Sequence, residues 1–171
     1  GELTDNYSPN EKVIRLSEKV YNSTSVAAVG IACHEAGHAA QHAEDYLPNK
    51  IRTALVPVTN FGSRFGLIIA FAGYFLAYLS NSPFGYYIII AGLLLYGLVA
   101  LFQFVTLPVE FNASRRALRV IDETGILAGD EYSAAKSVLT AAALTYVAAL
   151  ATAIANLLYY ASRLLGNSRR N

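Results

Sequence analysis

The chain has 171 residues, of which 54% are hydrophobic and only 15% are charged, and its net charge at pH 7 is +1. A soluble domain is typically about 25% charged, so this chain is unusually poor in charge. Disordered chains are poor in apolar residues and rich in charge, so the composition excludes one. The near-zero net charge speaks against nucleic-acid binding. Cys33 is the single cysteine, which excludes an intrachain disulfide. Residue 1 is glycine and methionine is absent, so we expect that sequence upstream of residue 1 is missing.

We predict that residues 1–60 form a water-facing segment, because acidic and basic residues concentrate in this part of the chain. The run Lys12–Ser17 alternates partly and contains β-branched residues, which predicts a short strand or one arm of a hairpin. Short polar residues at 22–25 are good helix N-caps, and the alanine-rich, proline-free stretch from Val26 to about Ala43 predicts a helix.

Two long stretches, residues 65–109 and 137–162, contain no Asp, Glu, Lys or Arg. A bilayer-spanning helix needs about 20 mostly apolar residues, and the turn-forming sequence Ser80–Pro83 divides the first stretch. We therefore predict a transmembrane hairpin over residues 61–107 and a third transmembrane helix over residues 137–163. A soluble all-helical bundle is the alternative, but such long uncharged stretches have no strongly polar face to present to water.

The remaining segments are mixed in charge. Residues 108–136 are predicted to be helical, with Pro108 in the first turn of a new helix and Gly125 ending it, and residues 164–171 form a polar tail. The sequence thus predicts a mainly α protein, a helical membrane protein with about three transmembrane helices. A short strand or hairpin precedes its water-facing helix.

The water-facing helix carries the sequence His34-Glu35-Ala36-Gly37-His38, an H-E-x-x-H motif. Residues i and i+4 lie on one helix face, so both imidazoles can reach one ion, and neutral imidazole suits Zn²⁺. Glu35 lies about 100° around the helix from His34, where it can take a proton from a water that the ion activates. The pattern predicts zinc ligands at His34 and His38 and a general base at Glu35. A surface helix that holds two histidines by chance is the alternative.

A catalytic zinc site needs a third protein ligand and one open position. The metzincin continuation is absent, because Gln41 and Glu44 occupy the positions of its glycine and its third histidine. His42 follows one turn after His38, but it lies about 80° from the face of His34. We therefore expect a surface or supporting role for His42.

Glu110 is the better candidate for the third ligand. A carboxylate at the end of a predicted span is costly without a partner, and a hairpin returns the chain to the membrane face that it left. The H-E-x-x-H helix precedes the hairpin and Glu110 follows it, so both are expected on the same face. In the alternative, Glu110 is an interfacial carboxylate paired with Arg115 or Arg116.

Three further polar residues are open to two interpretations. Asn112 and Ser114 could orient the histidines through a second layer of contacts, or they could be solvated residues of a helix face. Tyr146 in the third span could donate to an oxyanion, but we expect it to pack in the core.

The sequence resembles the neutral zinc metallopeptidases of bacterial membranes, the YugP-type family. Matching stretches are spread over nearly the whole chain: Val26–Gln41 with the H-E-A-G-H core, Ala54–Val58, Leu107–Phe111, Ala113–Arg116 and Ala141–Val147. The resemblance implies a small zincin-like site helix and a gluzincin-like centre, with ligands His34, His38 and Glu110 and base Glu35. The family often has a histidine at the position of Asn6 and an aspartate at that of Asn112, which leaves the roles of those two positions open here.

These observations predict an integral membrane zinc endopeptidase of the bacterial cell membrane. Its cofactor would be Zn²⁺, and its partners would be the lipid bilayer and a peptide or protein substrate, which could be membrane-associated, but no nucleic acid. One alternative is a catalytically inactive membrane scaffold or binding protein with a structural metal, and another is a bundle without metal. Basic residues on both sides of the hairpin predict that the zinc site faces the cytoplasm.

Overall fold

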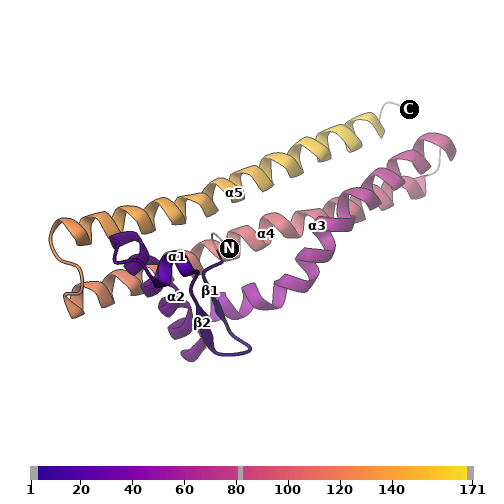
Figure 1. Ribbon diagram of the computed structural model, residues 1–171. Helices are drawn as coiled ribbons and strands as arrows, with labels where there is room; N and C mark the ends of the chain where they lie inside the picture. The colour runs from indigo at the N-terminus through magenta and orange to yellow at the C-terminus, as the bar shows by residue number, and fades with distance from the viewer. Residues whose placement is uncertain (1–3, 81–82, 169–171) are drawn as a thin grey trace. The chain divides into compact units, whose positions relative to one another are not determined.

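The computed structural model describes residues 4–80 and 83–168, and most of these residues are helical (Figure 1). The chain begins with an antiparallel hairpin and two shorter helices: β1 (Asn6–Ser8), β2 (Val13–Arg15), α1 (Glu18–Tyr21) and α2 (Val26–Ala43). Three long helices follow: α3 (Leu47–Ser80), α4 (Pro83–Thr124) and α5 (Asp130–Ser168). The predicted mainly α class, with a small hairpin before the H-E-x-x-H helix, is confirmed.

The three long helices have the length and apolar composition needed to cross a membrane. Large apolar side chains on them are exposed; Leu94 is 69% and Phe104 is 63% accessible. Such side chains would be costly in water and are stable against lipid tails. The prediction of a helical membrane protein with three spans is confirmed.

All three long helices extend beyond the predicted spans, and α5 does so at both ends of residues 137–163. α3 begins at Leu47, well before the predicted span, and it contains Pro57. α4 runs without a break through Pro108, so the prediction of a new helix starting there is wrong. A proline inside a helix costs about 3 kcal/mol, but Val109 and Ala113 directly after it are fully buried. Packing of this turn offsets the lost hydrogen bond and keeps the helix continuous.

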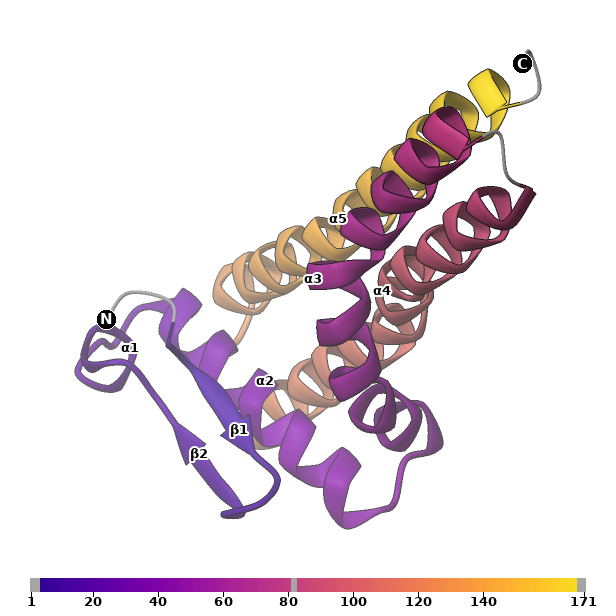
Figure 2. The ribbon, with the colours of Figure 1, turned by 90° about the vertical axis from the view of Figure 1, so that its right-hand side faces the viewer.

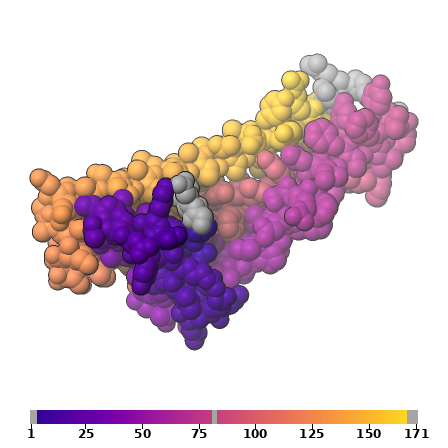
Figure 3. Space-filling view, in the orientation of Figure 1, coloured from indigo at the N-terminus to yellow at the C-terminus, as the bar shows by residue number. Residues whose placement is uncertain are grey.

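The chain forms two compact units, and each is considered by itself. Unit 1 comprises Gly1–Ile51 and Thr106–Tyr146, and unit 2 comprises Arg52–Val105 and Val147–Asn171. In unit 1, apolar side chains of α2, α4 and α5 form one core cluster, which includes Cys33, Ile121 and Ala135. The surface of this unit shows the N-terminal residues, in indigo and purple, lying against the orange start of α5 (Figure 3).

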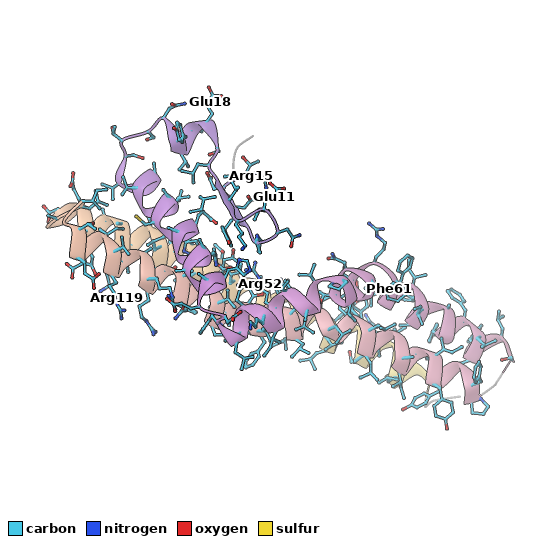
Figure 4. All side chains as sticks on the ribbon, turned by 90° about the horizontal axis from the view of Figure 1, so that it is seen from below. Glu11, Arg15, Glu18, Arg52, Phe61 and Arg119 are labelled. Carbon is cyan, nitrogen blue, oxygen red and sulfur yellow. The ribbon has the colours of Figure 1, made fainter. Side chains whose placement is uncertain are left out.

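The β1–β2 hairpin runs beside α2 in unit 1 (Figure 2). Tyr7 of β1 is tied to the helix, since its hydroxyl lies 2.7 Å from Nδ1 of His42. The carboxylate of Asp5 accepts hydrogen bonds from the backbone N–H and the hydroxyl of Ser17. Glu11 in the turn forms an ion pair with Arg15 of β2, and both residues are labelled in Figure 4. The contact between Tyr7 and His42 holds β1 against α2.

Close backbone packing joins α3 and α4 in unit 2. Glycines line the contact on both helices: Gly62, Gly66 and Gly73 on α3, and Gly85 and Gly92 on α4. A Cβ atom at Gly66 would lie 2.7 Å from the backbone nitrogen of Tyr96, and one at Gly92 would lie 2.4 Å from that of Ala70. Small residues of this kind let helix backbones approach each other in membranes, where no hydrophobic effect drives them together.

Replacing Gly92 with alanine is expected to destabilise the α3–α4 hairpin by about 1–3 kcal/mol, because the new methyl group meets backbone atoms that cannot move aside. The measurement is unfolding in detergent micelles, followed by helical circular dichroism. The matched control is Gly97→Ala, whose Cβ would lie 3.5 Å from the Leu157 side chain, an ordinary contact. Alanine there should be neutral or stabilise by up to about 1 kcal/mol. Equal stabilities of the two variants would contradict this account of the hairpin.

Candidate metal centre

The H-E-x-x-H helix is positioned by close contact with α4 inside unit 1. Ser25 caps α2, its hydroxyl accepting from the Ala28 backbone N–H. At Gly37, a Cβ atom would lie 2.7 Å from the carbonyl oxygen of Ala113. Glycine in the motif therefore allows the two helix backbones to touch, and this contact brings Glu110, one turn before Ala113, beside the histidines.

His34, His38 and Glu110 converge from these two helices. Oε2 of Glu110 lies 3.2 Å from Nε2 of His34 and 3.5 Å from Nε2 of His38. The side chain of Glu110 is only 2% exposed, and the two imidazoles are 15% and 13% exposed. The imidazole rings stand nearly perpendicular, with centroids 4.7 Å apart. Two ligand atoms bound about 2.0–2.1 Å from a tetrahedral zinc ion lie about 3.3–3.4 Å apart. The distances from Glu110 to the two imidazoles, and the chemistry of the three side chains, therefore fit zinc.

Each histidine is held at its other ring nitrogen. The hydroxyl of Ser114 lies 3.2 Å from Nδ1 of His34, and Oε1 of Gln41 lies 3.0 Å from Nδ1 of His38. Fixing Nδ1 directs Nε2 of both rings toward Glu110, an arrangement typical of histidines that bind metal. Of the two expectations for Ser114, the structure favours contact with a histidine over a solvated helix face.

Gln41 was not among the residues singled out from the sequence. It is fully buried, and its amide nitrogen donates to the carbonyl of Val109 at 2.7 Å and to Oδ1 of Asn112 at 2.9 Å. The signal in the sequence was a lone polar residue in an alanine-rich helix, three positions after His38 and thus on the same face.

Asn112 contacts no ligand directly, and its link to the histidines runs through Gln41. Its Oδ1 atom also accepts from Nε of Arg116 at 2.8 Å, and Arg116 binds both carboxylate oxygens of Glu44 at 2.8 and 2.7 Å. Arg116 thus pairs with Glu44 and Asn112, and not with Glu110 as one alternative expected. Asn112 accepts both hydrogen bonds through Oδ1, an atom that aspartate also has. Asparagine can therefore replace the aspartate that is common at this position in the family without losing these two contacts.

Two other residues lie where the sequence left their roles open. His42 is bound to Tyr7 and anchors the hairpin, in line with the expected supporting role. Tyr146 is half-buried and lines a cavity of about 290 Å³ together with His34, Glu35 and Glu110. Tyr146 thus lies at the wall of this cavity and is not fully enclosed in the core, and its donation to an oxyanion stays a prediction.

Glu35 is buried between the two histidines of the motif and the β1 strand. Burial raises the pKa of its carboxyl above the ordinary value, while the nearby His38 and His34 and a hydrogen bond from the Tyr7 backbone N–H oppose the rise. Burial lowers the pKa of His38, but its hydrogen bond with Glu110 and the charge of that carboxylate outweigh this, so the net pKa is raised. Protons therefore compete with a metal for His38 as the pH falls, since binding needs a neutral imidazole.

Comparison with known proteins identifies the class of the chain. The sequence model of the family described as "Putative neutral zinc metallopeptidase" matches residues 1–164, and the chain belongs to this family. A relative from Bacillus subtilis (strain 168), "Putative membrane protease YugP", is 40% identical over 171 residues, which cover all of this chain and 73% of that protein. No solved structure matches the chain. The family resemblance seen in the sequence is confirmed, and the chain is a membrane protein of this metallopeptidase family.

Replacing Gln41 with leucine is expected to weaken zinc binding by about 10–100-fold, the usual effect of removing a contact that orients a metal ligand. The measurement is competition for zinc with a chromogenic chelator. The control is His42→Gln, a neighbouring change on α2 at a residue that binds Tyr7 and not the metal-binding residues. Parental zinc affinity in the Gln41→Leu variant would show that the Gln41 contact does not position His38.

Proposed function

We propose that this protein is a membrane-embedded zinc-dependent endopeptidase that hydrolyses peptide bonds in peptides or proteins. The observation that carries the proposal is the convergence of His34, His38 and Glu110, with Glu35 beside them at the wall of one cavity. Among the described residues this group offers three ligand atoms within 4.8 Å of one another. Three protein ligands leave one position open, as catalytic zinc sites do, whereas structural sites are closed by four.

The side chains divide the chemistry between them. Zinc held by His34, His38 and Glu110 would supply Lewis acidity, which makes water a nucleophile near neutral pH. Glu35 would take the proton from the attacking water and pass it to the nitrogen of the departing amine. Gln41 and Ser114 keep the ligands oriented and touch no reacting atom.

The proposal is tested with the full chain purified in detergent. Zinc content is measured by mass spectrometry, and hydrolysis is measured with a quenched-fluorescent peptide library. We expect stoichiometric zinc, and cleavage that stops on treatment with 1,10-phenanthroline and returns with added zinc. A zinc-loaded protein that cleaves no member of the library would contradict the endopeptidase and favour the inactive scaffold with a structural metal.

We also propose that the metal centre faces the cytoplasm of the bacterial cell. Seven basic residues precede or follow the uncharged stretch 65–109 in the sequence: Lys50, Arg52, Arg64, Arg115, Arg116, Arg119 and Lys136. Ser80 ends α3, and the sequence Ser80–Pro83 between the two helices contains no charged residue. Basic residues favour the cytoplasmic side of a membrane, which supports this orientation.

A cysteine at Ser80, in a Cys33→Ser background, should react with a membrane-impermeant maleimide added to intact cells. The expectation follows because, in the proposed orientation, the end of α3 lies on the side of the membrane away from the cytoplasm. Labelling is detected by gel shift, with a cysteine at Glu123 as the matched probe for the other face. Labelling of Ser80→Cys only after lysis, with labelling of Glu123→Cys in intact cells, would reverse the orientation.

A further inference from the structure

The cavity beside the metal centre is polar on one side, where His34, Glu35 and Glu110 lie, and elsewhere its wall is formed mostly by apolar residues of α5. We propose that this wall is a binding pocket for an apolar side chain of the substrate, adjoining the bond that is cleaved. The inference rests on the proposed peptidase function and names its substrate class: peptides with a medium-sized or large apolar residue next to the scissile bond.

The wall is built by one face of α5. Val138, Leu139, Ala142, Ala143 and Tyr146 line the cavity from this helix. Residues three or four positions apart lie on the same face of a helix, so these five positions form one continuous strip along α5. Leu139 is 2% and Ala143 is 3% exposed, so the floor of the pocket is fixed by packing. Ile31, one turn before Glu35 on α2, adds apolar surface on the opposite side.

The size of the cavity fits one large side chain and the peptide group that carries it. Its volume is about 290 Å³, whereas a dry cavity of about 150 Å³ with apolar walls already binds benzene. Two alanines in the middle of the wall, Ala142 and Ala143, keep this space open. A larger side chain at Ala142 would project into it, because alanine contributes only a methyl group there.

The charges at the cavity favour neutral side chains over acidic ones. Asp5, Glu35 and Glu110 line it, and no Lys or Arg does so among the described residues. Glu110 would be neutralised by the zinc that it binds, but an acidic substrate side chain would still lie near the carboxylates of Asp5 and Glu35 without a basic partner. The carboxylate of Asp5 already accepts two hydrogen bonds from Ser17. A basic substrate side chain would have to compete with Ser17 for this carboxylate.

The test compares Ala142→Leu with Ala141→Leu, the adjacent exposed alanine that does not line the cavity. The probes are quenched-fluorescent peptides that are identical except for Phe, Leu, Ala, Lys or Glu placed in turn on each side of the scissile bond. We expect the parental protein to prefer Phe and Leu. In Ala142→Leu, kcat/KM for the Phe peptide should fall at least about 10-fold relative to the Ala peptide, since hydrophobic pockets discriminate side-chain size by about 10–200-fold. Ala141→Leu should keep the parental ratio.

Zinc content of each variant verifies that the metal centre is intact, and Ala142→Val provides a smaller change if the leucine variant does not fold. A parental preference for Lys or Glu, or the same Phe-to-Ala ratio in Ala142→Leu, Ala142→Val and Ala141→Leu, would overturn the pocket while leaving the peptidase function in place. A parental protein that cleaves none of the peptides, nor any member of a random library, overturns the proposed function itself.

Discussion

Replacing Glu35 with glutamine is expected to lower kcat/KM by about 10²–10⁴-fold, the usual contribution of a positioned proton-transfer group. Glutamine has the size of glutamate and can still accept the Tyr7 backbone hydrogen bond, but it cannot take a proton from water at neutral pH. The loss corresponds to about 2.7–5.4 kcal/mol of transition-state stabilisation. Zinc content should remain at the parental value, because Glu35 is not one of the three converging ligands.

The comparison variants for Glu35 are His34→Ala and His38→Ala, which should lose both zinc and hydrolysis. Activity is measured with a peptide that the parental protein cleaves, and zinc by mass spectrometry of the same samples. A Glu35→Gln protein that cleaves this peptide at the parental rate would rule out Glu35 as the base. Loss of zinc in that variant would instead place Glu35 among the ligands.

Replacing Glu110 with alanine is expected to weaken zinc binding by more than about 100-fold, beyond the effect of losing a contact that only orients a ligand. Glu110 supplies the carboxylate of the three-residue group, and its side chain is 2% exposed. Zinc that binds the folded state stabilises it by about 2.7 kcal/mol at a free concentration 100 times its Kd. Added zinc should therefore raise the unfolding temperature of the parental protein but not that of Glu110→Ala.

Glu110→Gln separates the loss of charge from the loss of volume, and Glu123→Gln on the same helix is the matched control at an exposed position. The zinc-dependent shift of unfolding temperature should be absent in Glu110→Gln and unchanged in Glu123→Gln. An undiminished shift in both Glu110 variants would mean that another residue provides the third ligand.

The parts of the site that follow from local geometry could be predicted from the sequence. The spacing of His34 and His38 fixes their common helix face whatever the rest of the chain does. Glu110 required a longer argument, namely that two spans return the chain to its starting side. The structure brings these three side chains together, and their binding of zinc stays a prediction for the experiments above.

Other parts depend on packing that no single segment reveals. Gln41 looked like one polar residue of a helix, because its partners Val109 and Asn112 lie in a distant segment. Pro108 suggested a helix start by its local chemistry, but burial of the next turn keeps α4 continuous. Tyr146 looked like a core residue, since the uncharged sequence around it gives no sign of the cavity that it lines.

The order of the ligands along the chain has a consequence for how the protein is made. His34 and Glu110 are 76 residues apart, and a ribosome adding about 5–20 residues per second needs about 4–15 s to reach Glu110 after His34. All of helix α3 and the part of α4 up to Glu110 are synthesised within this interval, so the ligand set is complete only after most of the α3–α4 hairpin has been made. A nascent chain that carries only the H-E-x-x-H helix therefore lacks Glu110, the third candidate ligand, and the proposed metal centre cannot be assembled until the α3–α4 hairpin is being inserted.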